Sequence, residues 1–550
     1  MDWTRHLIIV PIILPLVTGA ALLLIDELRH TAKAAINLTS TLALLLAALA
    51  LMRIADQVPA GSDALSWSYA IGGWPAPFAI VLVLDRLSAL MLVLTAVLGT
   101  ASLVFSLARW HKSGPHFHTL FQFLLMGLGG AFLTGDLFNL FVFFEVMLAA
   151  SYGLLLYGSG VFRVRSGLHY IAINLAASLL FLVGVSLIYG VTGTLNMADL
   201  AARLPGVAPE DRMLLQAGAA ILGTAFLVKA GMWPLCFWLP SAYMAAAAPV
   251  AAIFALLSKV GVYVILRLTL LLFGSGAGEL SGFGGTVLLF GGMATVAFGA
   301  FGVLASQAMG RLAGYSVLVS SGTLLAAVAI GDASVLSGAL FYLVSSTLTI
   351  AALFMLIELV ERAQEPAADL LTVTMEAYGD EMDEEESGVN EVEEVGVAMP
   401  GALAILGVCF GCLALLLAGL PPLSGFIAKF ALLTAMMNVG GLGSAAGISG
   451  ATWVLVALVI LSGLGALVAL MRIGIRTFWA PLEVIVPRVL VVEIAPIVLL
   501  IALCLVLTVQ GGAMIRYTEA AAQSLHAPAS YIGGVLGPAP ASGGPEGAAR

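Results

Sequence analysis

Four ionisable side chains lie well inside long apolar stretches of the sequence. Glu145 belongs to the run Thr134–Tyr157, TGDLFNLFVFFEVMLAASYGLLLY, and Lys229, Lys259 and Lys429 lie in three further apolar segments. A charged side chain at the centre of a membrane helix costs about 2.5–3.5 kcal/mol on insertion scales, so a residue of this kind is a candidate functional residue. One acid and three bases in such positions suggest a path for protons or cations.

Glu145 and Lys229 suggest a proton site that can be switched. A desolvated lysine loses affinity for its proton, and a nearby carboxylate restores that affinity. A lysine whose affinity depends on the position of Glu145 could therefore take up and release protons. Two alternatives stay open: a purely structural ion pair at Glu145, and a Lys229 side chain that extends to the membrane interface.

Lys259 and Lys429 extend the same pattern. Lys259 lies in ALLSKVGVYVILR, with Ser258 beside it and Tyr263 one turn further on as possible relay partners. Lys429 is the counterpart of Lys229 in the second half of the chain. For both residues a structural or interfacial role stays open as the alternative.

The composition requires a membrane around these residues. The 550 residues are 61% hydrophobic and 10% charged, with a mean hydropathy of +1.09, which no soluble globular protein matches. The apolar runs are continuous over about twenty residues, as in helices, and do not alternate as barrel strands do. Runs long enough to span a membrane lie at residues 7–25, 34–54, 87–108, 119–135, 137–158, 167–192, 214–234, 245–273, 282–305, 312–330, 335–360, 400–437, 451–473 and 489–509.

These runs predict an all-α polytopic membrane protein with about fourteen transmembrane helices. An even number places both termini on one side of the membrane. The distribution of Lys and Arg among the loops favours the outside for both.

The first of two proline breaks lies next to Lys229. Pro234 removes one helix hydrogen bond and displaces the carbonyl of Ala230. The hexapeptide AGMWPL, which begins at Ala230, matches AGLPPL, which begins at Ala418, 188 residues later. Paired broken helices in two halves of a chain indicate a transporter built from inverted repeats.

The second break lies before Lys429. Pro421 and Pro422 free the carbonyls of Leu417 and Ala418 in the same way, and Lys429 follows two turns later. Each half of the chain therefore combines a broken helix with a lysine inside an apolar segment.

The net charge of −9 is concentrated in one segment. Thirteen acidic residues and one arginine lie between residues 361 and 394, so the rest of the chain carries a small positive surplus. We interpret residues 361–399 as an acidic insertion between two spans, which attracts cations, contacts a partner subunit or is simply solvated. The acidic balance argues against nucleic-acid binding.

Most other residues capable of chemistry are interpreted as structural. The four cysteines lie in apolar segments, and Cys409 and Cys412 have no second pair to complete a metal site. The seven histidines lie at loops or helix ends, so no metal or cofactor site is predicted. Asp85 and Asp136, at the starts of apolar runs, are interpreted as helix caps.

Four stretches together resemble the D-type membrane component of the Mrp-type (Pha-type) monovalent cation/proton antiporters, which is homologous to the antiporter-like membrane subunits of respiratory complex I. They are TGDLFNLFVFFEVMLAASYGLLLY, VKAGMWPLCFWLPSAYMAAAAPV, SKVGVYVILR and AGLPPLSGFIAKF. The resemblance covers about residues 75–510. It implies that Glu145, Lys229, Lys259 and Lys429 translocate protons.

The resemblance also implies a division of the chain. It implies fourteen helices with two inverted five-helix repeats, each containing a proline-broken helix. The expected parts are helices 1–3 (1–116), the first repeat (117–273), the second repeat with the acidic loop (274–473), a last helix (474–526) and a disordered Pro/Gly/Ala-rich tail (527–550).

The function implied is that of a transporter subunit and not of an enzyme. The family works in the bacterial cytoplasmic membrane as a hetero-oligomer of six or seven subunits. It exchanges K⁺ or Na⁺ for protons in pH and salt homeostasis, without ATP or a redox cofactor. The alternative is a proton-pumping subunit of a complex I-like NADH dehydrogenase or membrane hydrogenase.

Two departures from the complex I pattern weaken that alternative. Complex I relatives often read LP-D-A-H where this chain has LPSAY at residues 239–243. The segment Phe341–Ala351, FYLVSSTLTIA, lacks the His and Lys of those relatives and has no charge until Glu358. The central relay is left to Ser, Thr, Tyr and water. The acidic insertion favours the potassium-efflux (Pha) branch of the family.

Overall fold

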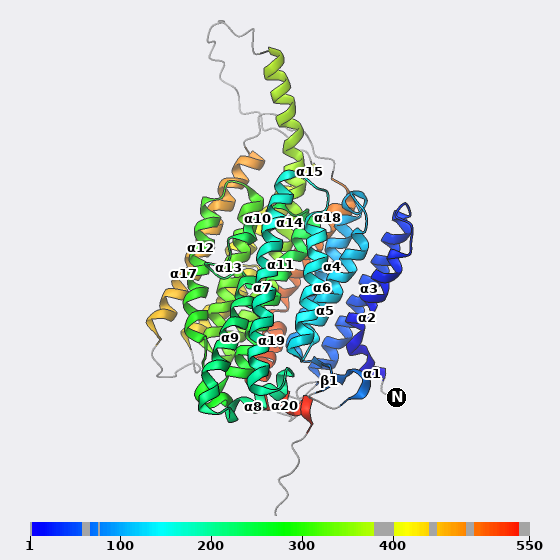
Figure 1. The fold of residues 1–550 in the computed structure, drawn as a ribbon. Coiled ribbons are helices and arrows are strands. Elements are labelled where there is room, and N and C mark those ends of the chain that lie inside the picture. Colours follow the sequence, from blue (N-terminus) through cyan, green and yellow to red (C-terminus); the bar gives the residue numbers. More distant parts are fainter. Residues whose placement is uncertain are drawn as a thin grey trace, which may run out of the picture.

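Twelve helices in the described part of the chain are long and apolar enough to cross a membrane, and they run side by side in one bundle (Figure 1). This computed structural model describes residues 3–57, 67–74, 78–378, 401–438, 448–479 and 489–537, with the backbone alone at residues 3–4 and 363–378. The twelve are α3 (His30–Asp56), α4 (Arg86–Ser106), α6 (Leu137–Leu155), α7 (Val161–Thr192), α9 (Pro209–Ala230), α11 (Ala248–Phe273), α12 (Gly285–Ala305), α13 (Met309–Ile330), α14 (Ala333–Tyr378), α15 (Gly401–Ala418), α17 (Gly450–Gly474) and α18 (Val491–Val509).

Shorter elements complete the described chain. The other helices are α1 (Trp3–His6), α2 (Val10–Leu23), α5 (Phe117–Leu133), α8 (Met197–Arg203), α10 (Trp238–Ala245), α16 (Ser424–Met437), α19 (Gly511–Leu525) and α20 (Pro528–Leu536). One antiparallel hairpin joins β1 (Trp67–Ala70) to β2 (Val81–Leu84), with Trp67 opposite Leu84. The hairpin, α1 and α20 lie at the same end of the bundle (Figure 1), which we call the terminal end.

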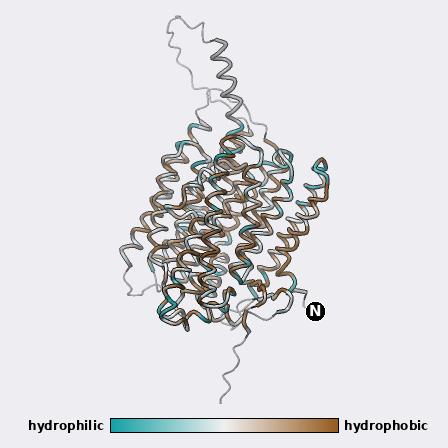
Figure 2. Tube along the Cα trace, in the orientation of Figure 1, coloured by the Kyte–Doolittle hydropathy of each residue, from teal (hydrophilic) through white to brown (hydrophobic). Residues whose placement is uncertain are grey.

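The bundle has an interior and an outer layer. The apolar stretches of α11 and α14 are entirely buried and that of α4 is 83% buried, whereas α3, α7 and α18 bury less than half of theirs. Apolar residues cover the length of the bundle, and hydrophilic residues gather at its two ends (Figure 2). This is the pattern of a bundle whose outer helices face lipid and whose inner helices face protein.

Two aspartates begin helices as the sequence predicts. The Asp85 carboxylate accepts a hydrogen bond from the Ser88 N–H at 2.8 Å, and the Ser88 hydroxyl in turn accepts one from the Asp85 N–H at 2.9 Å. Asp136 accepts one from the Asn139 N–H at 2.9 Å. Both contacts satisfy donors that the first turn of a helix leaves free, so the capping interpretation is confirmed.

Both proline segments lie between helices. α9 ends at Ala230, Gly231 adopts a φ of 73°, and α10 begins only at Trp238. α15 ends at Ala418, Gly419 adopts a φ of 76°, and α16 begins at Ser424. Glycine ends each helix because the left-handed conformation there carries no steric penalty for it.

Predictions about the C-terminal part of the chain are wrong in two places. Residues 528–536 form α20 and not a disordered tail, because Pro528 starts the helix and Tyr531 is buried against the bundle. The predicted span at residues 489–509 matches α18, but the part predicted as one last helix, residues 474–526, also contains α19, which follows α18 after Gln510. Residues 538–550 lie outside the described residues.

The acidic insertion is helical at its start. α14 continues to Tyr378, well beyond the apolar stretch that ends near residue 362. The rest of the predicted insertion, residues 379–399, lies outside the described residues.

Candidate functional site

Glu145 lies on α6 beside α7. The hydroxyl of Ser178, a buried residue of α7, donates a hydrogen bond to the Glu145 carboxylate. The carboxylate is itself only partly buried. Ser178 therefore links the Glu145 side chain of α6 to α7.

Lys229 lies in the last turn of α9 and is 5% exposed. Its ammonium group donates a long hydrogen bond of 3.5 Å to the side-chain oxygen of Asn174 on α7. It also lies 5.2 Å from the centre of the Phe144 ring, within range of a cation–π contact. The Asn174 amide nitrogen donates to the Tyr170 carbonyl at 2.8 Å, which turns the amide oxygen toward Lys229.

Helix α7 therefore contacts both the predicted acid, Glu145, and the predicted base, Lys229. The charged atoms of Glu145 and Lys229 are more than 4.0 Å apart, so the two residues form no direct ion pair. Their partners Ser178 and Asn174 are four residues apart on α7 and share one face of that helix. Sequence reasoning missed both residues, although two polar residues at this spacing in an apolar helix are a readable signal.

Lys259 is fully buried in the middle of α11. Its ammonium group donates to the Ser321 hydroxyl on α13 at 3.1 Å. The predicted relay partner Ser258 turns away and donates to the Ala255 carbonyl of its own helix. Tyr263, the other predicted partner, donates to the Phe132 carbonyl at 2.7 Å.

A close helix crossing brings Lys229 and Lys259 to the same region. A Cβ on Gly261 of α11 would lie 2.7 Å from the backbone nitrogen of Ala230 on α9, so the two backbones are in contact there. Lys229 precedes Ala230 by one residue and Lys259 precedes Gly261 by two. Both lysines therefore flank one crossing point.

Hydroxyl groups lead from Lys259 toward the second broken helix. Ser320, next to Ser321, hydrogen-bonds to Ser346 of α14 at 2.9 Å. Ser345 hydrogen-bonds to Ser424, the first residue of α16, at 3.0 Å. A cavity beside these groups offers about 20 Å³ to the centre of a water molecule, which is enough for one water. Its polar lining consists of Ser316, Tyr342, Ser345, Ser346, Thr349, Lys429 and Ser462.

Lys429 reaches back from α16 to the break itself. Its ammonium group donates to the carbonyls of Leu417 at 3.0 Å and Ala418 at 2.9 Å, the two groups that the sequence predicts to be freed by the prolines. Gly463 of α17 leaves room for this contact, because a Cβ there would lie 2.6 Å from the Ala418 oxygen and 3.1 Å from the lysine nitrogen. The break, the lysine and the cavity form one site.

Known proteins match this chain over most of its length. Residues 134–455 match the family described as NADH:quinone oxidoreductase/Mrp antiporter, transmembrane. The D component of a probable K⁺/H⁺ antiporter from Rhizobium meliloti (strain 1021) is 62% identical over 97% of this chain and 98% of the relative. The D component of an Na⁺/H⁺ antiporter from Alkalihalophilus pseudofirmus is 33% identical over 97% of this chain and 99% of the relative.

A solved structure matches as well. A chain of the Mrp complex from Dietzia sp. DQ12-45-1b superposes with a TM-score of 0.80 and 27% identity, over 98% of this chain and 100% of that chain. These matches confirm the resemblance to the D components of the antiporters and do not favour the complex I-like alternative. With twelve candidate spans among the residues that the structure describes, the chain is a multi-pass bacterial membrane protein and a transporter rather than an enzyme. It belongs to the NADH:quinone oxidoreductase/Mrp antiporter family.

Proposed function

We propose that this chain is the proton-translocating subunit of a multi-subunit monovalent cation/proton antiporter, and that Glu145, Lys229, Lys259 and Lys429 carry its protons. The observation that carries the proposal is the set of neutral partners around Lys229 and Lys259, which are buried, and around Lys429, which is half-buried. These are an amide at Lys229, a hydroxyl at Lys259 and two carbonyls at Lys429. A neutral acceptor can accept a hydrogen bond from the lysine ammonium group and still let the lysine lose its proton. A carboxylate, by contrast, would hold the lysine in its charged form.

In the first step a proton passes between Glu145 and Lys229. The Ser178 and Asn174 contacts hold the two groups on one face of α7 but apart. When the pair closes, the carboxylate favours the charged lysine; when the pair opens, the lysine gives up its proton. The proton then crosses to Lys259 at the contact between α9 and α11.

The second half of the path runs from Lys259 to Lys429. The Ser and Thr hydroxyls of α13 and α14 and water in the neighbouring cavity carry the proton between them. Moving one charge across 100 mV is worth about 2.3 kcal/mol, so modest changes in lysine proton affinity couple the path to the membrane gradient.

We further propose fourteen membrane helices with two inverted five-helix repeats. Adding the shorter α2 and α5 to the twelve candidate spans gives fourteen, with α16 continuing the span that α15 begins. The repeats are α5, α6, α7, α9–α10 and α11 (residues 117–273) and α12, α13, α14, α15–α16 and α17 (residues 274–473). The fourth member of each set is the broken one, which supports this pairing.

The partners follow from the relatives. We propose a hetero-oligomer in the cytoplasmic membrane in which the lipid bilayer surrounds the outer helices. The relative at 62% identity is named for K⁺, so we propose K⁺ as the exchanged cation in preference to Na⁺. The exchange would serve pH and salt homeostasis.

The decisive experiment compares Glu145→Ala and Lys229→Ala with wild type in everted vesicles that contain the whole subunit set. We expect both variants to assemble and to lose exchange of protons for K⁺, with Na⁺ as the comparison cation. Assembly is measured by co-purification of the other subunits. Full exchange in either assembled variant would disprove the proposed path.

A further inference from the structure

Three polar side chains follow one face of α11 from the middle of the bundle to its terminal end. Lys259, Tyr263 and Arg267 are spaced four residues apart, so they lie one above another on the helix, and all three are buried. The Tyr263 hydroxyl accepts a hydrogen bond from the Arg267 guanidinium at 3.1 Å. The path proposed above turns toward Lys429 after Lys259 and has no use for the other two residues.

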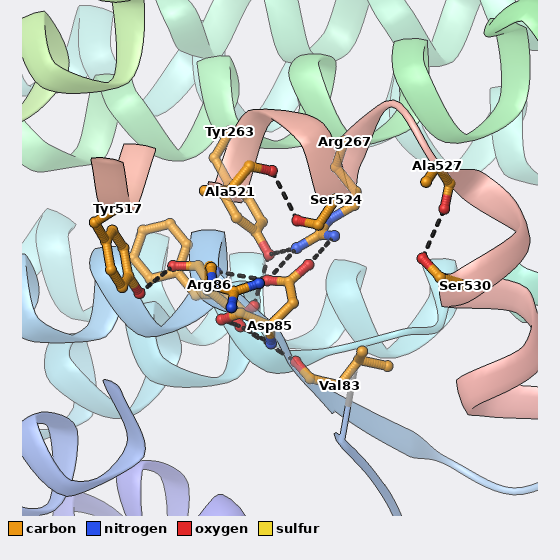
Figure 3. A network of polar contacts seen from close by, with 12 residues as sticks. Val83, Asp85, Arg86, Tyr263, Arg267, Tyr517, Ala521, Ser524, Ala527 and Ser530 are labelled. Atoms are coloured by element: carbon orange, nitrogen blue, oxygen red, sulfur yellow. Dashed lines mark hydrogen bonds and ion pairs between the residues drawn. The ribbon is translucent and has the colours of Figure 1, made fainter. Parts of the chain in front are cut away.

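Lys259, Tyr263 and Arg267 form a polar stripe on α11, and a carboxylate lies at its end. The guanidinium of Arg267 bonds both oxygens of Asp85, the residue that caps α4 (Figure 3). Each side chain of this pair is 7% exposed. Burial would raise the pKa of Asp85, but the charge and hydrogen bonds of Arg267 outweigh it and hold that pKa below its usual value. The carboxylate is therefore ionised and can accept a proton once Arg267 moves away.

Stability alone does not account for this pair. Replacing a buried ion pair by apolar residues of similar size is often neutral or stabilising, because removing two charges from water is expensive. Helix capping does not need Arg267 either, since Asp85 binds Ser88 without it.

A cavity lies against the ion pair at the terminal end. Asp85 and Arg267 form one wall, and Ser524, Ser530 and Tyr531 of the C-terminal helices contribute to the other. The cavity offers about 20 Å³ to the centre of a water molecule, again enough for one water. The Tyr531 ring lies 5.3 Å from the guanidinium carbon of Arg267, so α20 covers the pair.

We propose that this cluster is an outlet of the proton path at the terminal end, in which Tyr263 and Asp85 transfer the proton while Arg267 and Tyr531 position and cover them. The inference rests on the proposed function of Lys259. The step requires the Lys259 ammonium to leave the Ser321 hydroxyl and the Tyr263 hydroxyl to turn from the Phe132 carbonyl, to which it donates in this structure. An N–H bond of the Lys259 ammonium then breaks as the Tyr263 oxygen takes that proton, and the original Tyr263 proton moves to an Asp85 oxygen. Tyr263 stays neutral. The neutral Asp85 releases Arg267 and passes its proton to water in the cavity.

The first test removes the relay and keeps the packing. Tyr263→Phe in the complete subunit set should slow exchange of protons for K⁺ in everted vesicles by about tenfold or more, since a positioned proton-transfer group contributes at least that much. The matched control is Tyr517→Phe, which removes another hydroxyl of the same cluster, one that donates to the Arg86 carbonyl at 2.9 Å and lies off the stripe (Figure 3). The control should stay within about twofold of wild type.

A second variant tests the acceptor. Asn is as good a helix cap as Asp but has no carboxylate to protonate, so Asp85→Asn should preserve the cap and lose exchange. A protein in which the pair only fastens α4 to α11 would keep its exchange rate in Tyr263→Phe, because that ring still fills its place. If Asp85→Asn does not assemble, Tyr263→Phe decides the question alone.

Two substitutions of Tyr531 test whether α20 covers the cavity. Tyr531→Ala should uncover the cavity and speed the collapse of an imposed pH gradient in the absence of K⁺ and Na⁺. Tyr531→Phe keeps the ring over Arg267 and should not. Equal rates of proton leakage in the two variants would show that α20 is not part of the outlet.

Failure of this inference can be told from failure of the proposed function. Wild-type exchange in assembled Tyr263→Phe and Asp85→Asn, together with loss of exchange in Glu145→Ala, would overturn the outlet and leave the main path standing. Full exchange in Glu145→Ala would overturn the main path itself.

Discussion

The charged side chains inside this protein differ in their partners, and one buried lysine, Lys33, is paired with the Glu27 carboxylate at 2.6 Å. Arg267 and Arg362 each bond a buried carboxylate, Asp85 and Glu493 respectively. Lys229, Lys259 and Lys429 bond only neutral oxygens among the described residues. A carboxylate fixes the proton on its partner, whereas a neutral acceptor leaves it exchangeable. Lys229, Lys259 and Lys429 are therefore suited to carry protons, and Lys33 and the two arginines to hold positions.

Ser178 gives a sharp prediction about a single side chain. Its hydroxyl bonds the Glu145 carboxylate, and a hydrogen bond to a charged group is worth about 1.5–3 kcal/mol. Ser178→Ala should therefore slow proton exchange by about tenfold or more in everted vesicles. Ser186→Ala is the matched control, because Ser186 lies two turns further along α7, is exposed and bonds only the Leu182 carbonyl of its own helix. Equal rates in the two variants would contradict the role of Ser178.

Elements position the charges through close backbone contacts. α7 presents Asn174 and Ser178 on one face, and so sets the separation of Glu145 from Lys229. α9 and α11 touch at Gly261, and α17 touches the second break at Gly463. Small residues at these crossings let helices approach without a side chain between them, as is common in membrane bundles.

Gly463→Ala should disturb the second site. Its new methyl group would lie 2.6 Å from the Ala418 carbonyl and 3.1 Å from the Lys429 nitrogen, so α17 must move or the lysine must leave its carbonyls. Overpacking of this kind costs about 1–3 kcal/mol. We expect a lower melting temperature of the purified complex and slower exchange. Gly411→Ala on α15 is the control, since a Cβ there meets nothing within 4 Å.

Gly261→Ala should disturb the first site in the same way. The added Cβ would lie 2.7 Å from the Ala230 nitrogen and 2.9 Å from the Phe226 oxygen, and both are backbone atoms that cannot rotate away. Thermal unfolding of the purified complex should show the loss, together with reduced exchange. Gly223→Ala on α9 meets nothing within 4 Å and should behave as wild type. An unchanged Gly261→Ala protein would mean that the α9–α11 crossing is not needed.

Over the full length of the bundle, the C-terminal helices connect its two ends. Glu493, at the start of α18, bonds Arg362 of α14 at 2.7 Å. Further along, Thr518 of α19 bonds Ser337 near the start of α14 at 3.0 Å, and α20 then covers Arg267 at the terminal end. This segment therefore follows α14 from Arg362 to Ser337 and contacts helices from both proposed repeats.

Breaking the attachment at α18 should destabilise the molecule. Glu493 is 1% exposed, so Arg362→Ala would leave a buried carboxylate without its ion-pair partner, a loss of about 3–5 kcal/mol for buried pairs in general. We expect a clear fall in the melting temperature of the purified complex. Arg203→Ala is the control, because the Arg203 side chain is 47% exposed and pairs with an exposed basic group are worth about 0–1 kcal/mol. Equal effects would show that the Arg362–Glu493 contact is dispensable.

Features that depend on local composition can be read from the amino-acid order alone. Continuous apolar runs identify the membrane class and nearly all the spans, and proline positions identify both breaks. Even the carbonyls of Leu417 and Ala418 that Lys429 binds were predictable, because a proline frees a carbonyl at a fixed offset in the chain. The composition after residue 527 misled, since Pro528 begins α20 and Tyr531 is buried against the bundle.

The pairing of distant side chains, by contrast, came from helix packing. Arg267 and Asp85 are 182 residues apart, and Lys229 and Asn174 are 55 apart. Their contacts depend on the rotation and crossing of packed helices. The sequence can mark a polar face of one helix, as Asn174 and Ser178 do on α7, but it does not show which residue of another helix that face meets. The Ser and Thr hydroxyls of α13 and α14 are a second example. The sequence shows that these residues are present, but only the packing of the helices aligns them between Lys259 and Lys429.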